Sequence, residues 1–494
     1  MSLFPVEYNI PSLREWQIKA KYIINSNIDK CVVAVATGAG KGTLALDLIM
    51  DRLLSGKRCL FVVHRLSIIK DICEKATAMG FEYGIIQGNN TRDINHQFII
   101  ASSLSLVKRN EYFDFICIDE AHYIYSQLEK YLISCHSSEI VGFTATPFNP
   151  RMPKIYNKVI CTTTADELTN NGILVPLRIK VATRINIDNL GFNSNGEFKD
   201  TDIEEEGKAI LGDTVQFWIE NAIDRKTIVF ASTICHAEAI ANAFIERGVQ
   251  ANTYTANTDE HTREILIRKF KDEDDKLMVL TTVEALSTGF DAPIVSCIIG
   301  CRPLSKSFTT LVQMIGRGLR SYKNKVDCLL IDCDGNIGRF EDDYINLYYK
   351  GVHQLKSCSK LDRKNRAKQK KKIKDKTCPQ CSQSILIAGR CFSCGYILEF
   401  KPDKLSHVTK DIGLIDKSLG KKGYTNEMII WMMCCRTAMS SNKDKRLWRA
   451  KFLYRDFMGS LPPEDWKFKP STGITKEYEV FVRSKILEFL KGKK

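Results

Sequence analysis

A glycine-rich loop follows directly on an apolar run near the N-terminus. The run CVVAVA starts at Cys31 and leads into ATGAGKG, where Gly38, Gly40 and Lys41 precede an expected helix from Thr43 onward. Glycines let backbone amides approach a phosphate closely, a helix N-terminus adds positive potential, and a lysine can reach the β and γ phosphates. This pattern predicts a loop that binds the phosphates of a nucleotide.

Gly42 departs from that pattern. A hydroxyl that ligates Mg²⁺ is expected directly after the lysine, whereas here Gly42 follows Lys41 and Thr43 stands one place later. Either Thr43 supplies the ligand or a water molecule takes that coordination position. The glycine also leaves open a non-enzymatic alternative, in which the chain is a binding module with an inactive ATP site.

Two adjacent carboxylates, Asp119 and Glu120, end the apolar run FDFICID that starts at Phe113. At the end of a strand, Asp119 is placed to hold Mg²⁺ through its water shell, and Glu120 to orient and deprotonate an attacking water. Acidic residues at strand ends are often only turn residues, but the phosphate loop upstream favours the catalytic interpretation.

Four cysteines near the C-terminal third form two C-x2-C pairs with nine residues between them: Cys378, Cys381, Cys391 and Cys394. Such pairs present four thiolates to one Zn²⁺, and four protein ligands leave no open coordination position, so we expect a structural metal site. Unligated cysteines or a redox pair are the alternatives. The preceding basic run KNRAKQKKKIKDK favours nucleic-acid contact for this module. Protein docking or a purely stabilising role is the other interpretation.

The elements that position these residues are short apolar runs separated by segments of helical length. Expected strands begin at Cys31, Cys59, Phe98, Phe113 and Glu139, and again at Thr227, Ala251, Leu277, Val295 and Asp327. Buried strands that alternate with helices predict two α/β domains with parallel sheets, and ligands bind at the carboxyl ends of such strands. Between the two sets, NGILVPLRIKVATRINI is expected as an extended connection and NSNGEFKDTDIEEEG as a mobile surface excursion.

Several motifs stand in a characteristic order along the chain. They are LREWQ at Leu13–Gln17, the phosphate loop at Ala36–Gly42, DEAH at Asp119–His122, TATP at Thr144–Pro147, VLTTVEALSTGFDAP at Val279–Pro293 and QMIGRGLR at Gln313–Arg320. With these motifs the chain resembles the superfamily 2 helicases of the DEAH-like group. The resemblance is closest to phage-encoded and bacterial helicases that carry a C-terminal cysteine module.

That resemblance implies an α/β fold of two tandem RecA-like parallel-sheet domains, followed by a small zinc ribbon and a helical C-terminal region. The expected domains are a helicase ATP-binding domain at 1–162, a helicase C-terminal domain at 163–350, a basic linker at 351–376, the zinc ribbon at 377–400 and a helical basic tail at 401–494.

For the first domain, the resemblance implies that Gln17 contacts adenine and that the loop binds the nucleotide phosphates. The loop residues are Thr37, Gly38, Gly40, Lys41 and Thr43. Asp119 and Glu120 would act on Mg²⁺ and water, and His122 would connect the nucleotide to the TATP segment.

For the second domain, the resemblance implies that Gly289 and Asp291 approach the ribose and phosphates. Gln313, Arg317 and Arg320 would cross the cleft between the domains. A guanidinium from the opposite domain would stabilise the charge that develops on the γ-phosphoryl group, so only the closed cleft would be a complete ATPase.

Nucleic acid is expected to lie across both domains. HRLSII from His64, ASSLSL from Ala101 and the region from Thr281 to Ser287 correspond to family segments whose hydroxyls and amides hold the sugar-phosphate chain. Contacts of this kind carry little base information. The same residue types are also ordinary turn residues at strand ends, which is the alternative interpretation.

Charge is distributed unevenly along the 494 residues. Residues 1–350 hold 39 Lys and Arg against 44 Asp and Glu, whereas residues 351–494 hold 33 against 14, so the whole net charge of +14 comes from the last third. Clustered positive charge favours a polyanionic partner, because neutralised phosphates release counterions. A basic tail that only aids solubility is the alternative.

The aromatic residues of the tail lie among basic residues: Trp431, Trp448, Phe452 and Tyr454. Such residues can stack on bases, but their helical spacing favours a role in a local core. Of the remaining fourteen cysteines, many lie in apolar runs, as Cys117 and Cys297 do, and we expect these cysteines, including the vicinal Cys434 and Cys435, to be reduced core residues.

The length predicts about three domains, and the 44% hydrophobic and 26% charged residues exclude a disordered or fibrous chain. We expect neither a membrane span nor a secretory signal, and a cytoplasmic location.

The sequence as a whole predicts an ATP-dependent helicase or translocase with ATP, Mg²⁺ and Zn²⁺ as cofactors. Nucleic acid is the expected partner, with DNA favoured over RNA and a protein partner possible through the ribbon or tail. An ATP-driven clamp, remodeller or sensor that separates no strands is the alternative, because no strand-separating pin is identifiable in the sequence.

Overall fold

The computed structural model describes residues 8–26, 29–64, 66–109, 111–283, 286 and 292–355, together with single residues and short pieces within 378–396 and 431–462. The chain divides into two compact units, residues 1–397 and 398–494. Two predicted site residues, Gly289 and Asp291, lie outside the described residues, as does most of the predicted basic linker.

The first sheet has seven strands, all parallel, in the order β3-β4-β2-β5-β6-β1-β7. Its strands are β1 Lys30–Ala34, β2 Cys59–Val63, β3 Gly84–Ile86, β4 Phe98–Ser102, β5 Phe115–Ile118, β6 Glu139–Thr144 and β7 Lys158–Ile160. The five strands that the sequence predicts in this part are present, and β3 and β7 are two short additional ones. Their apolar runs are buried because helices cover both faces of the sheet.

The register of this sheet places three predicted motifs together at the carboxyl ends of its strands. β1 pairs with β6, and β6 pairs with β5, so that Ala34 lies opposite Thr144 and Ile118 opposite Gly142. Since all three strands are parallel, the phosphate loop, the DEAH segment and the TATP segment follow neighbouring strands at the same end.

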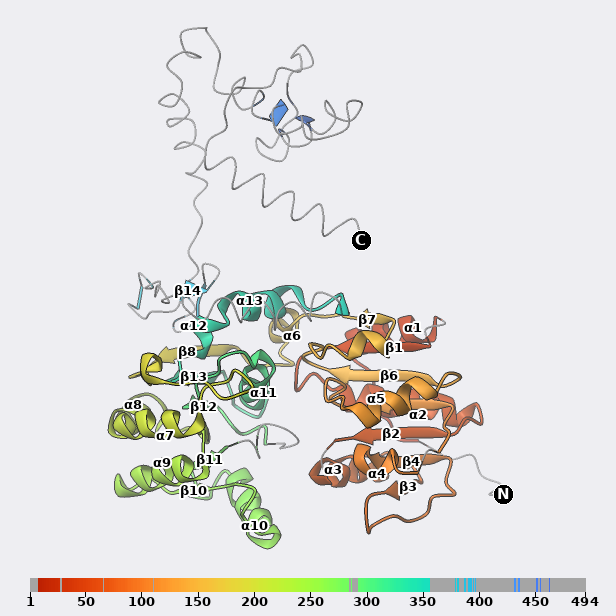
Figure 1. Ribbon diagram of the computed structural model, residues 1–494, viewed down its shortest axis with the longest axis horizontal. Coiled ribbons are helices and arrows are strands. Elements are labelled where there is room, and N and C mark those ends of the chain that lie inside the picture. The colour runs from red at the N-terminus through yellow and green to blue at the C-terminus, as the bar shows by residue number, and fades with distance from the viewer. Residues whose placement is uncertain are drawn as a thin grey trace. The chain divides into compact units, whose positions relative to one another are not determined.

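Helices of the first lobe pack against both faces of this sheet (Figure 1). They are α1 Glu15–Asn25, α2 Lys41–Leu54, α3 Leu66–Ala78, α4 Ser103–Leu106, α5 Ser126–Ser134 and η1 Met152–Lys154. The helix that follows them, α6 Ala165–Asn170, contacts α13 Glu341–Lys350. In α2 the apolar residues recur at helical spacing, and Leu44, Leu48 and Ile49 are buried against the sheet.

The second sheet has six parallel strands in the order β10-β11-β9-β12-β13-β8. They are β8 Leu177–Val181, β9 Thr227–Phe230, β10 Ala251–Thr253, β11 Val279–Thr282, β12 Cys297–Gly300 and β13 Cys328–Asp332. Two parallel-sheet lobes confirm the predicted fold class. The expected connection NGILVPLRIKVATRINI is in part a strand, because β8 pairs with β13 and forms an edge of this sheet.

Helices of the second lobe include one that the sequence analysis missed. They are η2 Ile187–Asn189, α7 Asp200–Ala209, α8 Leu211–Ala222, α9 Ile234–Glu246, α10 Glu260–Lys271, α11 Phe308–Gly318, α12 Asn336–Arg339 and α13 Glu341–Lys350. The expectation of a mobile excursion is wrong for α7. Ile203 of this helix is buried in a small apolar cluster with Ile185, Leu190 and Phe198, which explains why the polar segment is folded.

The two lobes share one apolar cluster, which includes Leu44 of the first lobe and Ile298 of the second. α11 lies on the side of the second lobe that faces the first (Figure 1). A Cβ placed on Gly316 of α11 would lie 2.9 Å from Cβ of Thr37, so this helix touches the phosphate loop. The helix that ends in the QMIGRGLR motif is therefore part of the lobe interface.

The zinc-ribbon segment contains a short antiparallel pair, β14 Leu386–Ile387 and β15 Arg390–Cys391. In the second unit, the rings of Trp431 and Tyr454 pack edge to face at 5.9 Å and both are buried. These two tail aromatics are core residues, as the helical spacing favoured. Trp448 and Phe452 lie outside the described residues.

The described cysteines of the two lobes are free thiols. Cys117, Cys297, Cys434 and Cys435 are buried, as predicted, but Cys235 is exposed, so the interpretation as a core residue is wrong there. Within the described ranges, no helix is long and apolar enough to cross a membrane.

Candidate active site

The phosphate loop has a backbone that its glycines make possible. Gly38 and Gly40 have φ values of +86° and +101°, a region that other residues rarely adopt, and Gly40 directly precedes α2. Lys41 is the first residue of α2. Its Nζ is buried without a hydrogen-bond partner among the described residues, and the Glu120 carboxylate lies 3.9 Å away. A buried ammonium without a hydrogen-bond acceptor is a group prepared for an anionic ligand.

Gly42 is not needed for the backbone of the loop. A Cβ at this position would meet no atom within 4 Å. Thr43, the other candidate for the hydroxyl ligand, donates its backbone amide to the Gly40 carbonyl at 3.2 Å. The fold therefore has room for a hydroxyl at position 42, although the sequence places the nearest one at Thr43.

Gln17 holds the phosphate loop from the side of α1. Its Nε2 donates to the Gly40 carbonyl at 2.9 Å, and its Oε1 accepts from the Arg14 amide at 2.6 Å. The Arg14 guanidinium also donates to the Ala39 carbonyl at 2.8 Å. The sequence analysis missed Arg14, although it lies within the LREWQ motif. The adenine contact of Gln17 stays a prediction.

Asp119 and Glu120 lie at the end of β5, with their side chains enclosed by the lobe interface. Burial, followed by the neighbouring Glu120 charge, raises the pKa of Asp119. Burial also acts to raise the pKa of Glu120, but Lys41, His122 and Arg317 outweigh it and keep that pKa below its usual value. Glu120 is therefore ionised at neutral pH and can accept a proton from water.

Glu120 also has an unusual backbone. Its φ of +45° lies in the left-handed region that residues with a side chain rarely adopt. Its neighbour Ala121 donates its amide to the Phe143 carbonyl at 2.9 Å, which anchors the turn to β6. Strained conformations of this kind are held in place only by surrounding structure, and they concentrate at functional sites.

His122 connects the two lobes. The Gln313 amide donates from Nε2 to His122 Nε2 at 2.9 Å, so the imidazole proton is on Nδ1, which donates to the Thr144 hydroxyl at 2.8 Å. Burial lowers the pKa of His122 to about 4, and the ring is neutral at pH 7. Tyr123, which the sequence analysis missed, donates its hydroxyl to Gln313 Oε1 at 3.2 Å and thereby orients that amide.

The two motif arginines lie at the phosphate loop. Arg317 is 4% exposed and lies close enough to Glu120 to lower its pKa. A Cβ on Gly38 would lie 2.9 Å from Cγ of Arg320, and Arg320 forms a β-bridge with Leu174. The structure thus places Arg317 near Glu120 and the aliphatic part of the Arg320 side chain against the phosphate loop.

In the segments expected to hold nucleic acid, several hydroxyls form hydrogen bonds within the protein. Ser102 accepts the Ser105 amide at 3.3 Å as the cap of α4, and Thr281 shares a hydrogen bond with Thr253 at 3.1 Å. His64 is buried, which lowers its pKa to about 4, and its ring packs 5.5 Å from that of Tyr123. These are contacts within the protein, and contacts of the same segments with nucleic acid stay a prediction. Residues 287–291 lie outside the described residues.

The four predicted metal ligands come together. The sulfur atoms of Cys378, Cys381, Cys391 and Cys394 all lie within 4.8 Å of one another. The Cys378 and Cys394 sulfurs are 3.8 Å apart, and those of Cys381 and Cys391 are 3.6 Å apart. Tetrahedral Zn–S bonds of about 2.3 Å put sulfur atoms about 3.8 Å apart. The donor set and its spacing therefore fit a zinc ion.

Comparisons with known proteins agree with this geometry. Residues 8–149 match the family described as "Type III restriction enzyme, res subunit", and residues 209–322 match "Helicase conserved C-terminal domain". These two matches include the phosphate loop, the DEAH segment, Arg317 and Arg320, so the residues brought together at the lobe interface belong to the matched regions.

Among curated relatives, a 51.5 kDa protein of a Lactococcus phage (isolate 7-9) is 26% identical over 395 residues, which cover 77% of this chain and 81% of the relative. A Schizosaccharomyces pombe protein named as a mitochondrial ATP-dependent helicase, irc3, is 29% identical over 338 residues, which cover 62% of this chain and 54% of that protein. The chain thus spans about half the length of the yeast relative.

Among solved structures, a fragment named as an HsdR subunit of a type I restriction enzyme from Vibrio vulnificus YJ016 shares the fold. Its TM-score is 0.53 at 20% identity, with 69% of this chain and 66% of that chain covered.

Proposed function

This chain belongs to the superfamily 2 helicases and has their ATP-hydrolysing core, and from that premise we propose that it is an ATP-dependent translocase or helicase that acts on DNA. The observation that carries the proposal is the contact between lobes. The second lobe delivers Gln313 to His122 and Arg320 to the phosphate loop, where the buried Lys41 faces Glu120. ATP bound at this interface would touch both lobes, so hydrolysis would change how they fit together.

The roles that we propose for the site residues combine the helicase resemblance with the positions of those residues that the structure describes. Lys41 and the amides of the glycine loop would bind the nucleotide phosphates, and Asp119 would hold Mg²⁺, which stabilises charge on the transferred phosphoryl group when it is bound. Glu120 would orient water and accept its proton. Arg317 and Arg320 would stabilise negative charge from the second lobe. Gln17 would contact adenine, and Thr37, Gly38, Gly40 and Thr43 would complete the nucleotide site. Gly289 and Asp291 would complete it from the second lobe.

DNA is the proposed nucleic acid because the family model that matches residues 8–149 is described as a restriction-enzyme subunit, and restriction enzymes act on DNA. The positive excess of residues 351–494 supports contact with a polyanion. The proposed domain boundaries remain those of the sequence analysis, with Zn²⁺ held by the four cysteines of the ribbon. The free thiols of the two lobes support a reducing compartment such as the cytoplasm.

The proposal is tested by ATP hydrolysis with single-stranded DNA, duplex DNA and RNA at stated salt. The wild-type protein should be stimulated most by DNA. Lys41→Ala should lose at least a hundredfold of this activity, because it removes the buried ammonium that lies at the start of α2 without a hydrogen-bond partner among the described residues. Lys154→Ala is the matched control, since its side chain is 61% exposed in the same lobe.

Stimulation by RNA alone would overturn the choice of DNA, and full activity of Lys41→Ala would overturn the catalytic assignment. A strand-displacement assay beside a triplex-displacement assay then separates a helicase from a translocase that leaves duplexes intact.

A further inference from the structure

The edge strand β8 of the second sheet has a partner on its outer side. β8 pairs with β13 on one side only, and an unpaired edge exposes backbone amides that must find another acceptor. The Ile179 amide donates to the carbonyl of Phe392 at 2.7 Å. Phe392 is far away in sequence and lies between Cys391 and Cys394 of the cysteine module. The module therefore covers the edge of the helicase sheet.

The side chain of Phe392 provides a second, independent contact. It is 4% exposed and belongs to the same apolar cluster as Ile179 and Leu330 of the second sheet. Its ring meets the ring of Tyr348, on α13, edge to face at 6.2 Å. Thus one residue of the module is hydrogen-bonded to β8 through its backbone and buried against α13 through its side chain.

Within its described residues, the module has little besides the four sulfurs to hold it in shape. It has one two-residue strand pair, in which Leu386 lies opposite Cys391, and the Cys391 amide donates to the Tyr396 carbonyl at 2.6 Å. A segment this short cannot bury a core of its own, and in such modules the metal supplies the folding free energy. The position of Phe392 next to Cys391 therefore depends on the metal.

We propose that the cysteine module is a metal-dependent brace of the second lobe, docked through Phe392 onto the surface formed by β8 and α13. The ion is Zn²⁺, and the occupant of that surface is this chain's own segment Arg390–Phe392. This use of the module differs from a free nucleic-acid-binding ribbon, because the knuckle that carries Cys391 points its aromatic residue into the lobe.

Contacts of α13 connect the docked module to the proposed nucleotide site. This step of the argument rests on the proposed function. Tyr348 donates its hydroxyl to Thr169 of α6 at 3.2 Å. It also lines a small apolar cavity together with Ala36 and Thr37 of the phosphate loop and Gly316 of α11. α13 thus contacts the docked module and borders the lobe interface, so loss of the metal should loosen both.

Hydrogen exchange of the full-length protein tests the docking directly. Because amides alternate in direction along a strand, the Ile179 amide faces the module whereas those of Arg178 and Lys180 face β13. Chelation of the metal, or the double substitution Cys378→Ser and Cys381→Ser, should speed exchange at Ile179 at least tenfold and leave Arg178 and Lys180 slow. The zinc content, measured in parallel, should fall from one ion per chain to none.

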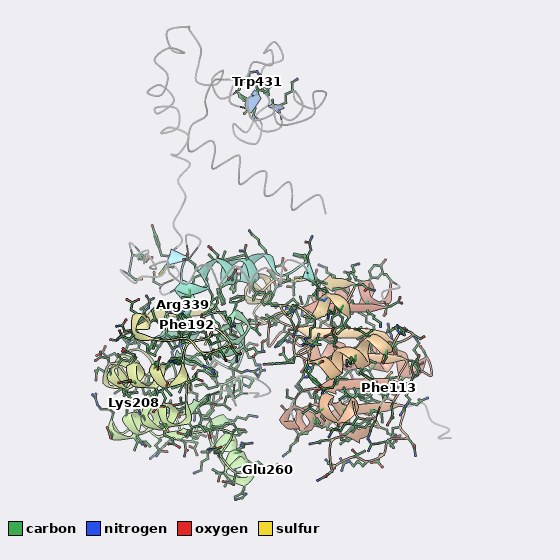
Figure 2. The ribbon with its side chains drawn as sticks, in the orientation of Figure 1. Phe113, Phe192, Lys208, Glu260, Arg339 and Trp431 are labelled. Carbon is green, nitrogen blue, oxygen red and sulfur yellow. The ribbon has the colours of Figure 1, made fainter. Side chains whose placement is uncertain are left out.

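Phe392→Ala separates docking from metal binding. This variant should keep one zinc ion and still exchange fast at Ile179. Phe192→Ala is the matched control, because Phe192 is an exposed aromatic residue of the same lobe (Figure 2) and should change neither readout.

The proposal is overturned if the metal-free protein keeps Ile179 protected, or if Phe392→Ala retains zinc and protection together. Should Phe392→Ala lose its zinc, Tyr348→Ala removes the other side of the contact without touching the module. Fast exchange at Ile179 with zinc retained then supports docking, and slow exchange rejects it. None of these readouts requires ATP hydrolysis. The experiments can therefore reject the docking proposal without rejecting the proposed function, and a failure of the proposed function leaves the docking test valid.

Discussion

At the scale of single residues, the glycines of the phosphate loop have different tasks. Gly38 and Gly40 need their positive φ, and Gly38 also lies against Arg320 of the second lobe. Gly42 has neither constraint, since a Cβ there would meet open space. The backbone therefore does not require a glycine at position 42, and a residue with a hydroxyl would fit there.

We predict that Gly42→Ser lowers the Mg²⁺ concentration needed for half-maximal ATP hydrolysis about tenfold, or about 1.4 kcal/mol. The added hydroxyl would stand where a direct Mg²⁺ ligand is expected. Magnesium titration of the ATPase measures the effect, with Gly42→Ala as the control that adds a Cβ without an oxygen. Equal Mg²⁺ requirements in the two variants would show that a hydroxyl at position 42 does not improve Mg²⁺ binding.

At the scale of elements, α11 packs closely against the phosphate loop because residue 316 is a glycine. A Cβ on Gly316 would lie 2.9 Å from Cβ and 3.1 Å from Oγ1 of Thr37. We expect Gly316→Ala to reduce ATP hydrolysis at least tenfold, because α11 must shift and carries the motif arginines with it. The melting temperature should change little, since the clash lies at the interface and not within a lobe.

The matched control for this prediction is Gly212→Ala in α8, where an added Cβ would meet nothing within 4 Å. That variant should hydrolyse ATP normally, and alanine should favour its helix. An active Gly316→Ala protein would mean that the lobes do not close through this contact.

The packing of α7 on α9 makes the second lobe sensitive to acid. The ring of His236 fills the space at Gly207, where a Cβ would lie 2.5 Å from Nε2, and burial lowers the pKa of His236 to about 4. The unfolded chain, with a histidine pKa of about 6.5, binds the proton first as the pH falls. The stability that His236 contributes is therefore complete above about pH 6.5 and is lost progressively towards pH 4.

We expect the melting temperature to fall between pH 7 and pH 5, and this fall should be smaller in His236→Gln, which cannot become charged. Calorimetry at both pH values measures the difference. An unchanged pH dependence in the variant would assign the effect to other buried histidines, such as His64 and His122.

At the scale of the whole molecule, charge and catalysis are divided between different parts of the chain. Residues 1–350 are slightly acidic and carry the proposed nucleotide site, whereas residues 351–494 carry the positive excess. Long-range electrostatic attraction to nucleic acid should therefore come from residues 351–494. The two lobes should provide the binding that depends on ATP.

Replacing Lys370, Lys371 and Lys372 by glutamine should weaken DNA binding and make it less salt-dependent. Each lost phosphate contact reduces the slope of log affinity against log salt by about 0.9. The same triple replacement at Lys130, Lys154 and Lys158, which are exposed in the first lobe, is the control. Binding measured from low to moderate salt should show a shallower slope only for the first set. Identical slopes would assign the contact to other basic residues.

Much of the fold and of the nucleotide site could be predicted from the sequence because the signals are local. A buried strand is a continuous apolar run, a phosphate loop needs its glycines and lysine at fixed spacing, and a metal knuckle needs two cysteines a turn apart. These properties belong to neighbouring residues, so they determined the two parallel-sheet lobes, the position of Lys41 and the cysteine cluster before any tertiary contact was known.

Other features were decided only when distant surfaces met. Leu177–Val181 is a strand because β13 offers it a partner, and α7 is ordered because Ile203 finds an apolar cluster. Tyr123 and Arg14 act at the site through groups of other elements. Phe392 covers an edge more than two hundred residues earlier in the chain. Such contacts depend on which faces pack together, and no local pattern encodes that choice.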